Sequence, residues 1–231
     1  MTDPLQPLLI VMAKEPRAGV TKTRLCPPLA PQQAADLYAA LLADTLDFAI
    51  RLPQVQAAVA VTPPDGLEYF LARAMEGVAY YPVEGRDIGE VLDRVLTAAL
   101  AEGHPAAIAI HSDGPTFPPS VIAEALDALE SHDLVLGPCD DGGYHLIGLK
   151  RACRQLFQGI EWSTPRVTEQ TLERARTLGL DVHLLPVAMD VDTAEDLARL
   201  TAQLDKDLAE RMPHTAAVLA RYMRGFSENR S

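Results

Sequence analysis

The chain is poor in cysteine, in long apolar runs and in positive charge. Its three cysteines, Cys26, Cys139 and Cys153, are odd in number and lack paired spacing, which argues against a disulfide framework and against a zinc knuckle. No apolar stretch reaches the roughly 18 residues of a membrane span, and the N-terminus lacks the basic start and long apolar run of a signal peptide. These absences predict a cytoplasmic protein with reduced thiols and no membrane span.

The balance of charge excludes further classes. Lysine and arginine total 20 against 32 aspartate and glutamate residues, so the formal net charge is −12 at pH 7. Such acidity disfavours broad binding to nucleic acid or to anionic membranes. With 231 residues, of which 48% are hydrophobic, the chain can bury a sizeable core. Composition therefore predicts a soluble protein whose cations, concentrated early in the chain, serve a small anionic ligand.

Apolar segments alternate with amphipathic ones along the chain. Seven are expected to be strands: Leu8–Met12, Val55–Thr62, Val78–Val83, Ala106–Ile110, Leu134–Leu136, Tyr144–Leu149 and Val182–Val187. Six more are expected to be helices: Pro31–Leu52, Leu67–Met75, Ile88–Ala101, Pro119–Glu130, Pro165–Leu178 and Ala194–Leu208. Strands that are apolar on both faces and alternate with helices indicate a parallel sheet covered on both sides. We therefore predict a single-domain α/β fold, with a mostly parallel, doubly wound sheet, over residues 1–208.

Residues 209–231 are expected to form a C-terminal helical tail, with a helix over Met212–Gly225. This segment contains Ala, Leu, Tyr and Met side chains, which suit packing on the body of the protein or on a second subunit. A homodimer is accordingly one expectation for the assembly.

A cationic loop follows the first expected strand. It carries one glycine, Gly19, among four cations, which are Lys14, Arg17, Lys22 and Arg24. The glycine lets the backbone come close to a ligand, and the cations can offset phosphate charge. The loop is neither a Walker loop nor a Gly-x-Gly-x-x-Gly fingerprint. It is interpreted either as a nucleotide phosphate site or as a solvated basic loop.

Aspartates follow several of the later expected strands, at the edge where ligands of open α/β sheets collect. Asp113 suits Mg²⁺ bridged to a phosphate, or else caps a turn. Asp141 precedes two glycines and can bind an acceptor hydroxyl, act as a base, or simply form a hairpin turn. Asp192 precedes Thr193, which can cap the next helix. Trp162 can stack on a ring or can serve core packing.

Several short motifs occur together and in order. They are Lys-Thr-Arg-Leu at 22–25, Ser-Asp-Gly-Pro at 112–115, Gly-Pro-Cys-Asp-Asp-Gly-Gly-Tyr-His-Leu-Ile-Gly-Leu at 137–149, Trp-Ser-Thr at 162–164 and Asp-Val-Asp-Thr-Ala-Glu-Asp-Leu at 190–197. Over roughly residues 8–205 this set resembles the DUF2064 family, which is associated with glycosyl transfer. That family is similar to 2-phospholactate guanylyltransferase and, more distantly, to molybdenum cofactor guanylyltransferase. The resemblance implies a nucleotide-diphospho-sugar transferase fold of the GT-A type.

The resemblance also implies roles for individual residues. It implies a set of nucleotide-binding residues, namely Lys14, Gly19, Lys22, Arg24 and Ser112. Asp113 and Asp192 are implied metal ligands, for Mg²⁺ or Mn²⁺. Asp141 falls where the acceptor or transferred group would lie, so Asp113, Asp141 and Lys22 are the expected catalytic residues.

The chain departs from the family's pattern at two places. His111 stands where relatives tend to have glycine. Val91 stands where they tend to have an arginine, soon after the glycine that matches Gly89. Arg86 or Arg94 can supply that cation instead. These departures leave the donor preference unassigned.

Three kinds of function follow from these residues. The first is a metal-dependent transferase that uses a nucleotide-diphospho-sugar donor and a small-molecule acceptor. In its alternative form, the enzyme moves a nucleoside monophosphate from a triphosphate to a small phosphorylated acceptor and releases pyrophosphate. The second is a non-catalytic nucleotide-binding protein, and the third is a scaffold. A scaffold predicts that Asp113 and Asp192 lie far apart.

Overall fold

A computed structural model of the chain describes residues 5–115 and 117–228. These residues fall into two compact units. The first comprises Met1–Lys14, Ala49–His111 and Phe117–Met189, and the second comprises Glu15–Phe48, Ser112–Thr116 and Asp190–Ser231. The expected boundary at residue 208 lies within helix α7 (Lys206–Arg211), and the division into 1–208 and 209–231 stays a prediction.

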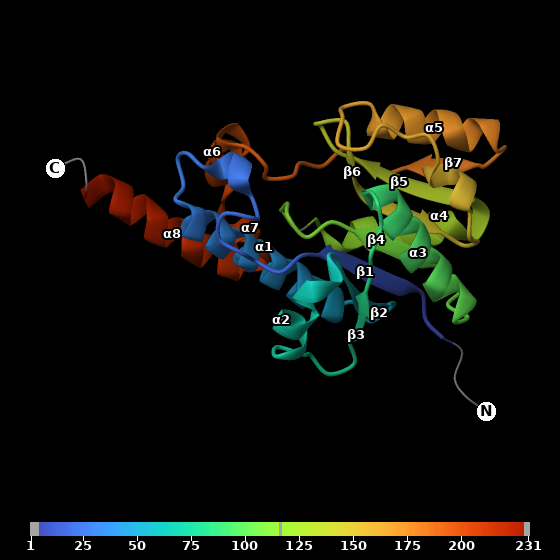
Figure 1. Cartoon of the computed structure of the whole chain (residues 1–231), viewed down its shortest axis with the longest axis horizontal. Coiled ribbons are helices and arrows are strands. Elements are labelled where there is room, and N and C mark those ends of the chain that lie inside the picture. Colours follow the sequence, from blue (N-terminus) through green and yellow to red (C-terminus); the bar gives the residue numbers. More distant parts are fainter. Residues whose placement is uncertain (1–4, 116, 229–231) are drawn as a thin grey trace. The chain divides into compact units, whose positions relative to one another are not determined.

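The first unit is built on a seven-stranded sheet in the order β3-β2-β1-β4-β6-β5-β7. Its strands are β1 (Leu8–Ala13), β2 (Gln56–Val61), β3 (Ala79–Pro82), β4 (Ala107–Ile110), β5 (Leu134–Pro138), β6 (Tyr144–Leu149) and β7 (Val182–Leu184). Neighbouring strands run parallel except at β6, which is antiparallel to both β4 and β5. The sheet, drawn as arrows in Figure 1, confirms the predicted α/β class with mostly parallel strands.

The turn between β5 and β6 explains the reversed strand. Gly142 has a φ of +91°, and a Cβ atom there would lie 2.0 Å from the carbonyl oxygen of Pro165. Asp141 Oδ1 accepts a hydrogen bond from the Gly143 backbone N–H over 2.8 Å. Because only glycine suits that φ and that contact, the turn is tight and brings β6 back beside β5.

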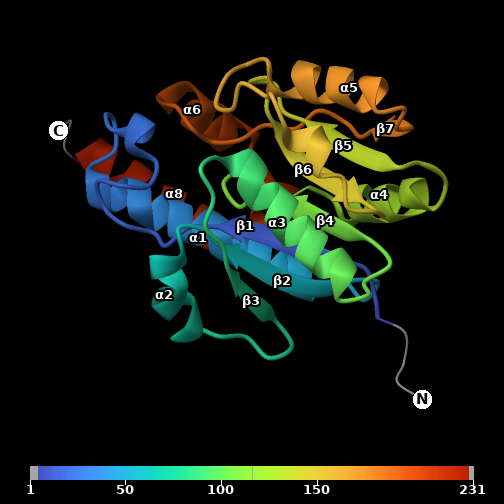
Figure 2. The same ribbon diagram turned by 45° about the vertical axis from the view of Figure 1, so that its right-hand side comes forward.

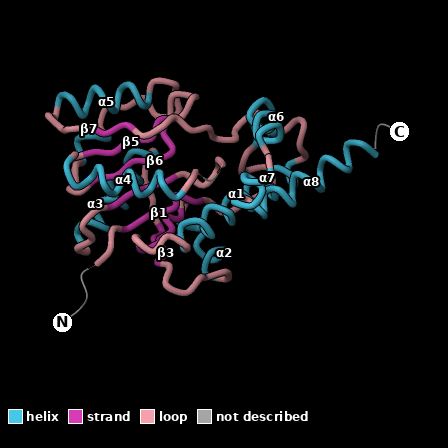
Figure 3. The backbone as a smooth tube through the Cα atoms, turned by 180° about the vertical axis from the view of Figure 1, so that it is seen from behind, coloured by secondary structure: helices cyan, strands magenta, loops and turns pink. Residues whose placement is uncertain are grey.

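Helices cover both faces of the sheet in the first unit. They are η2 (Pro64–Gly66), α2 (Leu67–Leu71), α3 (Ile88–Ala101), α4 (Pro119–Ser131), η3 (Arg154–Phe157) and α5 (Val167–Thr177). One core joins α3, η3 and α5 to alternate strand residues such as Leu8 and Ile10. On the other face, Leu129 of α4 meets Ile108 beside Gly148. Figures 2 and 3 show α3 and α4 from these opposite sides. Since alternate residues face opposite sides, strands covered twice are apolar throughout.

The second unit is helical. It contains η1 (Thr23–Leu25), most of α1 (Pro31–Ile50), α6 (Ala194–Gln203), α7 and α8 (Pro213–Glu228). The start of α8 is held by the buried carboxylate of Asp44, which accepts from the backbone N–H groups of His214 and Thr215 over 3.0 and 2.8 Å. Farther along, the Tyr222 hydroxyl donates to Asp36 Oδ2 over 3.0 Å. The predicted C-terminal helix therefore packs on α1.

Some elements differ from their predicted bounds. The helix expected over Ala194–Leu208 is divided into α6 and α7, because Asp205 begins a new helix by accepting from the Leu208 N–H over 2.8 Å. The strand expected over Val182–Val187 ends at Leu184, and the helix expected over Leu67–Met75 ends at Leu71. In the described part of the chain, every helix is too short or too polar to cross a membrane.

Candidate functional site

A charged cluster lies in the second unit. The Lys22 Nζ donates to Asp113 Oδ2 over 2.9 Å and to Asp192 Oδ1 over 2.5 Å. These partners are 91 and 170 residues away from Lys22 in the sequence. The two predicted metal ligands therefore lie together, contrary to what a scaffold protein predicts.

Burial and charge act in opposite directions on Lys22. Its side chain is only 5% exposed, and burial alone would lower the pKa of the ammonium. The carboxylates of Asp113 and Asp192 outweigh that effect and hold the pKa of Lys22 above its usual value. The carboxylates themselves are about one-third exposed, at 32% and 36%. A ligand in solvent can thus reach both aspartate side chains.

The backbone positions each member of this cluster. Lys22 has a φ of +51°, in the left-handed region that a non-glycine residue enters at a cost of about 1–2 kcal/mol. Asp113 O accepts from the Val191 N–H over 3.0 Å, which ties the Asp113 turn to the residue before Asp192. The Asp192 N–H donates to Asp196 Oδ2 over 3.2 Å. These bonds hold the two backbone segments that carry the carboxylates.

Two further contacts support the site, and each involves a residue that the sequence had singled out, Thr193 as a helix cap and Ser112 as a nucleotide-binding residue. Thr193 and Asp196 form a reciprocal capping box at the start of α6, beside Asp192. The hydroxyl groups of Ser112 and Tyr38 lie 3.1 Å apart in a buried hydrogen bond. The predicted Thr193 cap is confirmed. Nothing in the sequence connects Tyr38 to Ser112, and the nucleotide-binding role of Ser112 stays a prediction.

The cationic loop is folded on itself. The Arg17 backbone N–H donates to Thr21 Oγ1 over 3.1 Å, and that hydroxyl donates to Arg17 O over 3.0 Å. Arg17 also pairs with Glu15 at 2.6 Å, and Arg24, 70% exposed, pairs with Asp192 at 3.4 Å. Carboxylates thus offset part of the charge that the sequence suggested was available to a phosphate.

Gly19 serves the loop through its conformation. Its φ is +75°, and a Cβ atom there would meet nothing within 4 Å. The sequence predicts glycine here so that the backbone can come close to a ligand. In the structure, glycine is needed because the turn is left-handed, a conformation that glycine adopts without strain. The open space around Gly19 leaves room for a ligand, and its nucleotide-binding role stays a prediction.

Two predicted site residues belong to the first unit. Lys14 directly follows β1 and is exposed. Asp141 is exposed at the β5–β6 turn, where its carboxylate bonds to the Gly143 N–H. That bond is the turn-forming role which the sequence offered as an alternative. The catalytic role of Asp141 and the phosphate-binding role of Lys14 stay predictions.

The cluster has the chemistry of a small divalent-cation site. Among the described residues, no group of three or more His, Cys, Asp and Glu side chains is placed to hold a metal. Asp113 and Asp192 nonetheless supply oxygen ligands that already share one cation, the Lys22 ammonium. Mg²⁺ commonly takes one or two carboxylates and completes its shell with phosphate and water. The residues therefore fit a metal that arrives with a phosphorylated ligand.

Comparisons with known proteins find transferases. A phosphoenolpyruvate guanylyltransferase of Nocardia farcinica (strain IFM 10152) is 33% identical over 115 residues, which are 48% of this chain and 50% of the relative. This chain thus spans about half the length of the curated relatives that it matches. This relative and the Desulfovibrio desulfuricans structure described next are both named as transferases, in agreement with the predicted enzyme class.

Solved structures agree over more of the chain. One is a Desulfovibrio desulfuricans G20 protein provisionally described as a nucleotide-diphospho-sugar transferase, with a TM-score of 0.80 and 29% identity over 94% of this chain and 98% of that one. Another is a Mycobacterium tuberculosis H37Rv protein in complex with manganese, with a TM-score of 0.54 and 19% identity over 87% of this chain and 100% of that one. The first likeness confirms the predicted fold type, and the second supports the fold alone.

A family model matches residues 45–164, which is just over half of the chain. The matched region includes Asp113, Asp141 and Trp162, and leaves out the cationic loop and Asp192. The chain belongs to the DUF2064 family, whose description is an uncharacterized protein conserved in bacteria.

Proposed function

We propose that this protein transfers a sugar from a nucleotide-diphospho-sugar donor to a small-molecule acceptor and depends on a divalent metal. One observation carries the proposal: Lys22 holds Asp113 and Asp192 in one partly exposed cluster. A cation site of two carboxylates beside a lysine suits a diphosphate, whose charge both can offset.

Each residue has a definite part in this reaction. Asp113 and Asp192 would hold the cation, Mg²⁺ or Mn²⁺, which would neutralise charge on the diphosphate. Lys22 then donates to a phosphate oxygen and stabilises the charge that builds on the leaving group. An acceptor hydroxyl oxygen forms a bond to the anomeric carbon as the bond from that carbon to the diphosphate oxygen breaks. The hydroxyl proton passes to a carboxylate, for which Asp141 is the proposed base.

Glycosyl transfer is favoured over the alternative by the charge of the loop. Arg17 is paired with Glu15, and Lys22 and Arg24 are paired with carboxylates, so the loop carries less net positive charge than four cations suggest. A diphosphate needs less positive charge than a triphosphate does. The structural neighbour described as a nucleotide-diphospho-sugar transferase also matches over far more of the chain than the curated relatives do.

Nucleotidyl transfer is the second candidate. The Nocardia farcinica relative is named for this chemistry, in which an acceptor phosphate attacks the α-phosphorus of a triphosphate and pyrophosphate leaves. The same cluster would serve either reaction, because both develop charge on phosphate oxygens. The two candidates differ in the donor that binds.

The test is a thermal-shift panel of nucleotide sugars and nucleoside triphosphates, each with Mg²⁺, with Mn²⁺ and with a chelator. A donor at 100 times its dissociation constant adds about 2.7 kcal/mol of stability to the folded state. Metal-dependent stabilisation by nucleotide sugars supports glycosyl transfer. Stabilisation by triphosphates alone contradicts glycosyl transfer and supports nucleotidyl transfer. Nucleotide binding without turnover of any donor would instead indicate a non-catalytic binding protein.

Asp113→Asn provides the matching variant. It removes one charge from the cluster and keeps the side-chain shape, so donor turnover should fall by about 100-fold or more with little change in melting temperature. The control is Asp207→Asn on the exposed first turn of α7, which should keep full activity. Full turnover in the Asp113 variant would overturn the assignment of the site.

A further inference from the structure

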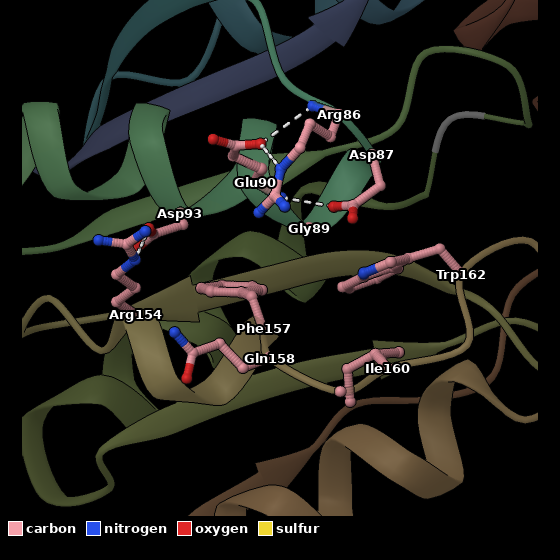
Figure 4. Close-up of a pocket in the computed structure, with 11 residues that line it drawn as sticks. Arg86, Asp87, Gly89, Glu90, Asp93, Arg154, Phe157, Gln158, Ile160 and Trp162 are labelled. Atoms are coloured by element: carbon pink, nitrogen blue, oxygen red, sulfur yellow. Dashed lines mark hydrogen bonds and ion pairs between the residues drawn. The ribbon is translucent and has the colours of Figure 1, made fainter.

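A polar pocket lies in the first unit, between the start of α3 and the segment that runs from η3 to Trp162. Its volume is about 180 Å³, roughly six water volumes of about 30 Å³ each. Figure 4 shows Arg86, Asp87 and Glu90 along one side, with the rings of Phe157 and Trp162 facing them. The pocket is open to solvent and is large enough for one substituted six-membered ring.

The position of Trp162 is dictated by Gly89. A Cβ atom at position 89 would lie 2.2 Å from the Trp162 ring, so any larger residue would displace the indole. The edge of Tyr144 supports the indole with ring centroids 6.4 Å apart. Trp162 is partly exposed, and Phe157 beside it is buried. The pocket thus has a fixed aromatic wall against which the apolar face of a ring can pack.

The opposite side offers hydrogen-bond acceptors that are held in place. Glu90 accepts from the Arg86 backbone N–H and from Arg86 Nε, each over 3.0 Å, and from Arg94 Nη2 over 2.7 Å. These bonds, the backbone one first, lower the pKa of Glu90 to about 2, so the carboxylate stays ionised at neutral pH. Asp87 Oδ1 accepts from the Glu90 N–H over 2.8 Å and caps α3.

Charge decides which kind of ligand fits. The lining holds three acids, Asp87, Glu90 and Asp93, against two arginines, Arg86 and Arg154. Both arginines face carboxylates already, because Arg86 bonds to Glu90 and Arg154 lies 3.7 Å from Asp93. Arg94, beside the lining, also bonds to Glu90, so three arginines balance the three acids and a phosphate or carboxylate would have to displace a carboxylate from an arginine. Hydroxyl groups, which donate to carboxylates and accept from arginine, suit this lining better.

We propose that this pocket binds one uncharged, hydroxyl-rich ring, a monosaccharide unit, with its apolar face on Trp162 and its hydroxyls on the acidic side. Its role as the acceptor of glycosyl transfer rests on the proposed function, whereas binding itself needs no donor. The sequence gave Trp162 and Arg86 separately as candidates for stacking and for charge. The pocket brings them together with acids that sequence reasoning had not assigned.

The test uses Trp162, which is the only tryptophan of the chain. The intact protein, without nucleotide or metal, is titrated with neutral monosaccharides and with their 6-phosphates while indole fluorescence is recorded. We expect a saturable change with at least one neutral sugar and at least about tenfold weaker binding of its phosphate. The absence of a saturable change with every neutral sugar, or tighter binding of the phosphates, would overturn the proposal.

Two variants check the geometry. Gly89→Ala should displace the indole, and Glu90→Gln should remove a hydroxyl acceptor, so each should weaken sugar binding about tenfold or more. Glu173→Gln, on the exposed surface of α5 in the same unit, is the matched control and should bind sugar as the parent protein does. Unchanged binding in folded forms of both pocket variants would refute the site, and melting curves establish that they are folded.

These outcomes are separable from those of the proposed function. If this protein binds sugar but turns over no nucleotide donor, the sugar site is supported and its role as an acceptor site is refuted. Donor turnover whose KM for a sugar acceptor is unaffected by Gly89→Ala and Glu90→Gln would support the enzyme and overturn the acceptor role of the pocket.

Discussion

The Val191 backbone N–H donates to the carbonyl oxygen of Asp113 over 3.0 Å. This bond joins the turn that carries one candidate metal ligand to the segment that carries the other, Asp192. It places both carboxylates beside the same ammonium before any ligand binds. A preorganised pair of this kind needs little rearrangement to accept a cation and a diphosphate.

Replacement of Lys22 by Met should destabilise the protein by about 1–3 kcal/mol. It leaves the carboxylates of Asp113 and Asp192 facing each other without the buried cation that now separates them. Urea unfolding measures the loss, and added Mg²⁺ should recover part of it by occupying the same oxygens. Lys206→Met, whose side chain is 87% exposed, is the control. An unchanged unfolding midpoint for the Lys22 variant would contradict this account.

Asp44→Ala should cost about 2–4 kcal/mol of folding free energy. The Asp44 carboxylate is buried and caps α8 by accepting from two backbone N–H groups, those of His214 and Thr215. Removing it leaves both donors without that partner and withdraws a negative charge from a helix N-terminus. Asp44→Asn keeps one acceptor oxygen and should lose about half as much. Guanidinium unfolding of the two variants checks the order, and equal stability with the parent protein would be a refutation.

Acid should weaken the fold through His145. Burial, and secondarily the neighbouring His111, lower the pKa of His145 to about 4 in the folded protein, against about 6.5 when unfolded. Between these values the unfolded chain binds the extra proton, so stability is full above pH 6.5 and falls as the pH drops towards 4. The loss attributable to this group is about 3 kcal/mol.

The difference between the parent protein and His145→Gln isolates that contribution. Chemical unfolding at several pH values should give a shallower loss of stability for this variant between pH 6.5 and 4. His132→Gln, at the end of α4, serves as the control and should retain the parent slope. The same slope in all three proteins would rule out His145 as the source.

Gly142→Ala should be costlier than Gly179→Ala, although both glycines have positive φ values, +91° and +69°. At Gly179 a Cβ atom meets nothing within 4 Å, so the expected cost is the conformational one alone, about 1–2 kcal/mol. At Gly142 it would also strike the Pro165 carbonyl at 2.0 Å, which adds roughly 1–3 kcal/mol. Thermal unfolding compares the pair, and equal losses would show that the turn shifts freely.

Local pattern was sufficient for most of the sheet. The expected strand Leu8–Met12 is β1 with one residue added, and Tyr144–Leu149 is β6 as predicted. Burial on both faces produces a continuous apolar run that is visible without knowledge of any neighbour. The helix expected over Ala194–Leu208 was less well predicted, since the cap at Asp205 interrupts a pattern that remains amphipathic on either side.

The sequence by itself determined which residue types carry the chemistry: the acids after the strands, the lysine in the loop, and the glycines where φ is positive. These depend on short stretches of chain, and so does the alternation of strands and helices. The tertiary structure decided which of those residues meet. Lys22 reaches carboxylates 91 and 170 residues away, and Trp162 packs on Gly89. Such contacts depend on the path of the whole chain, which no local period or motif encodes.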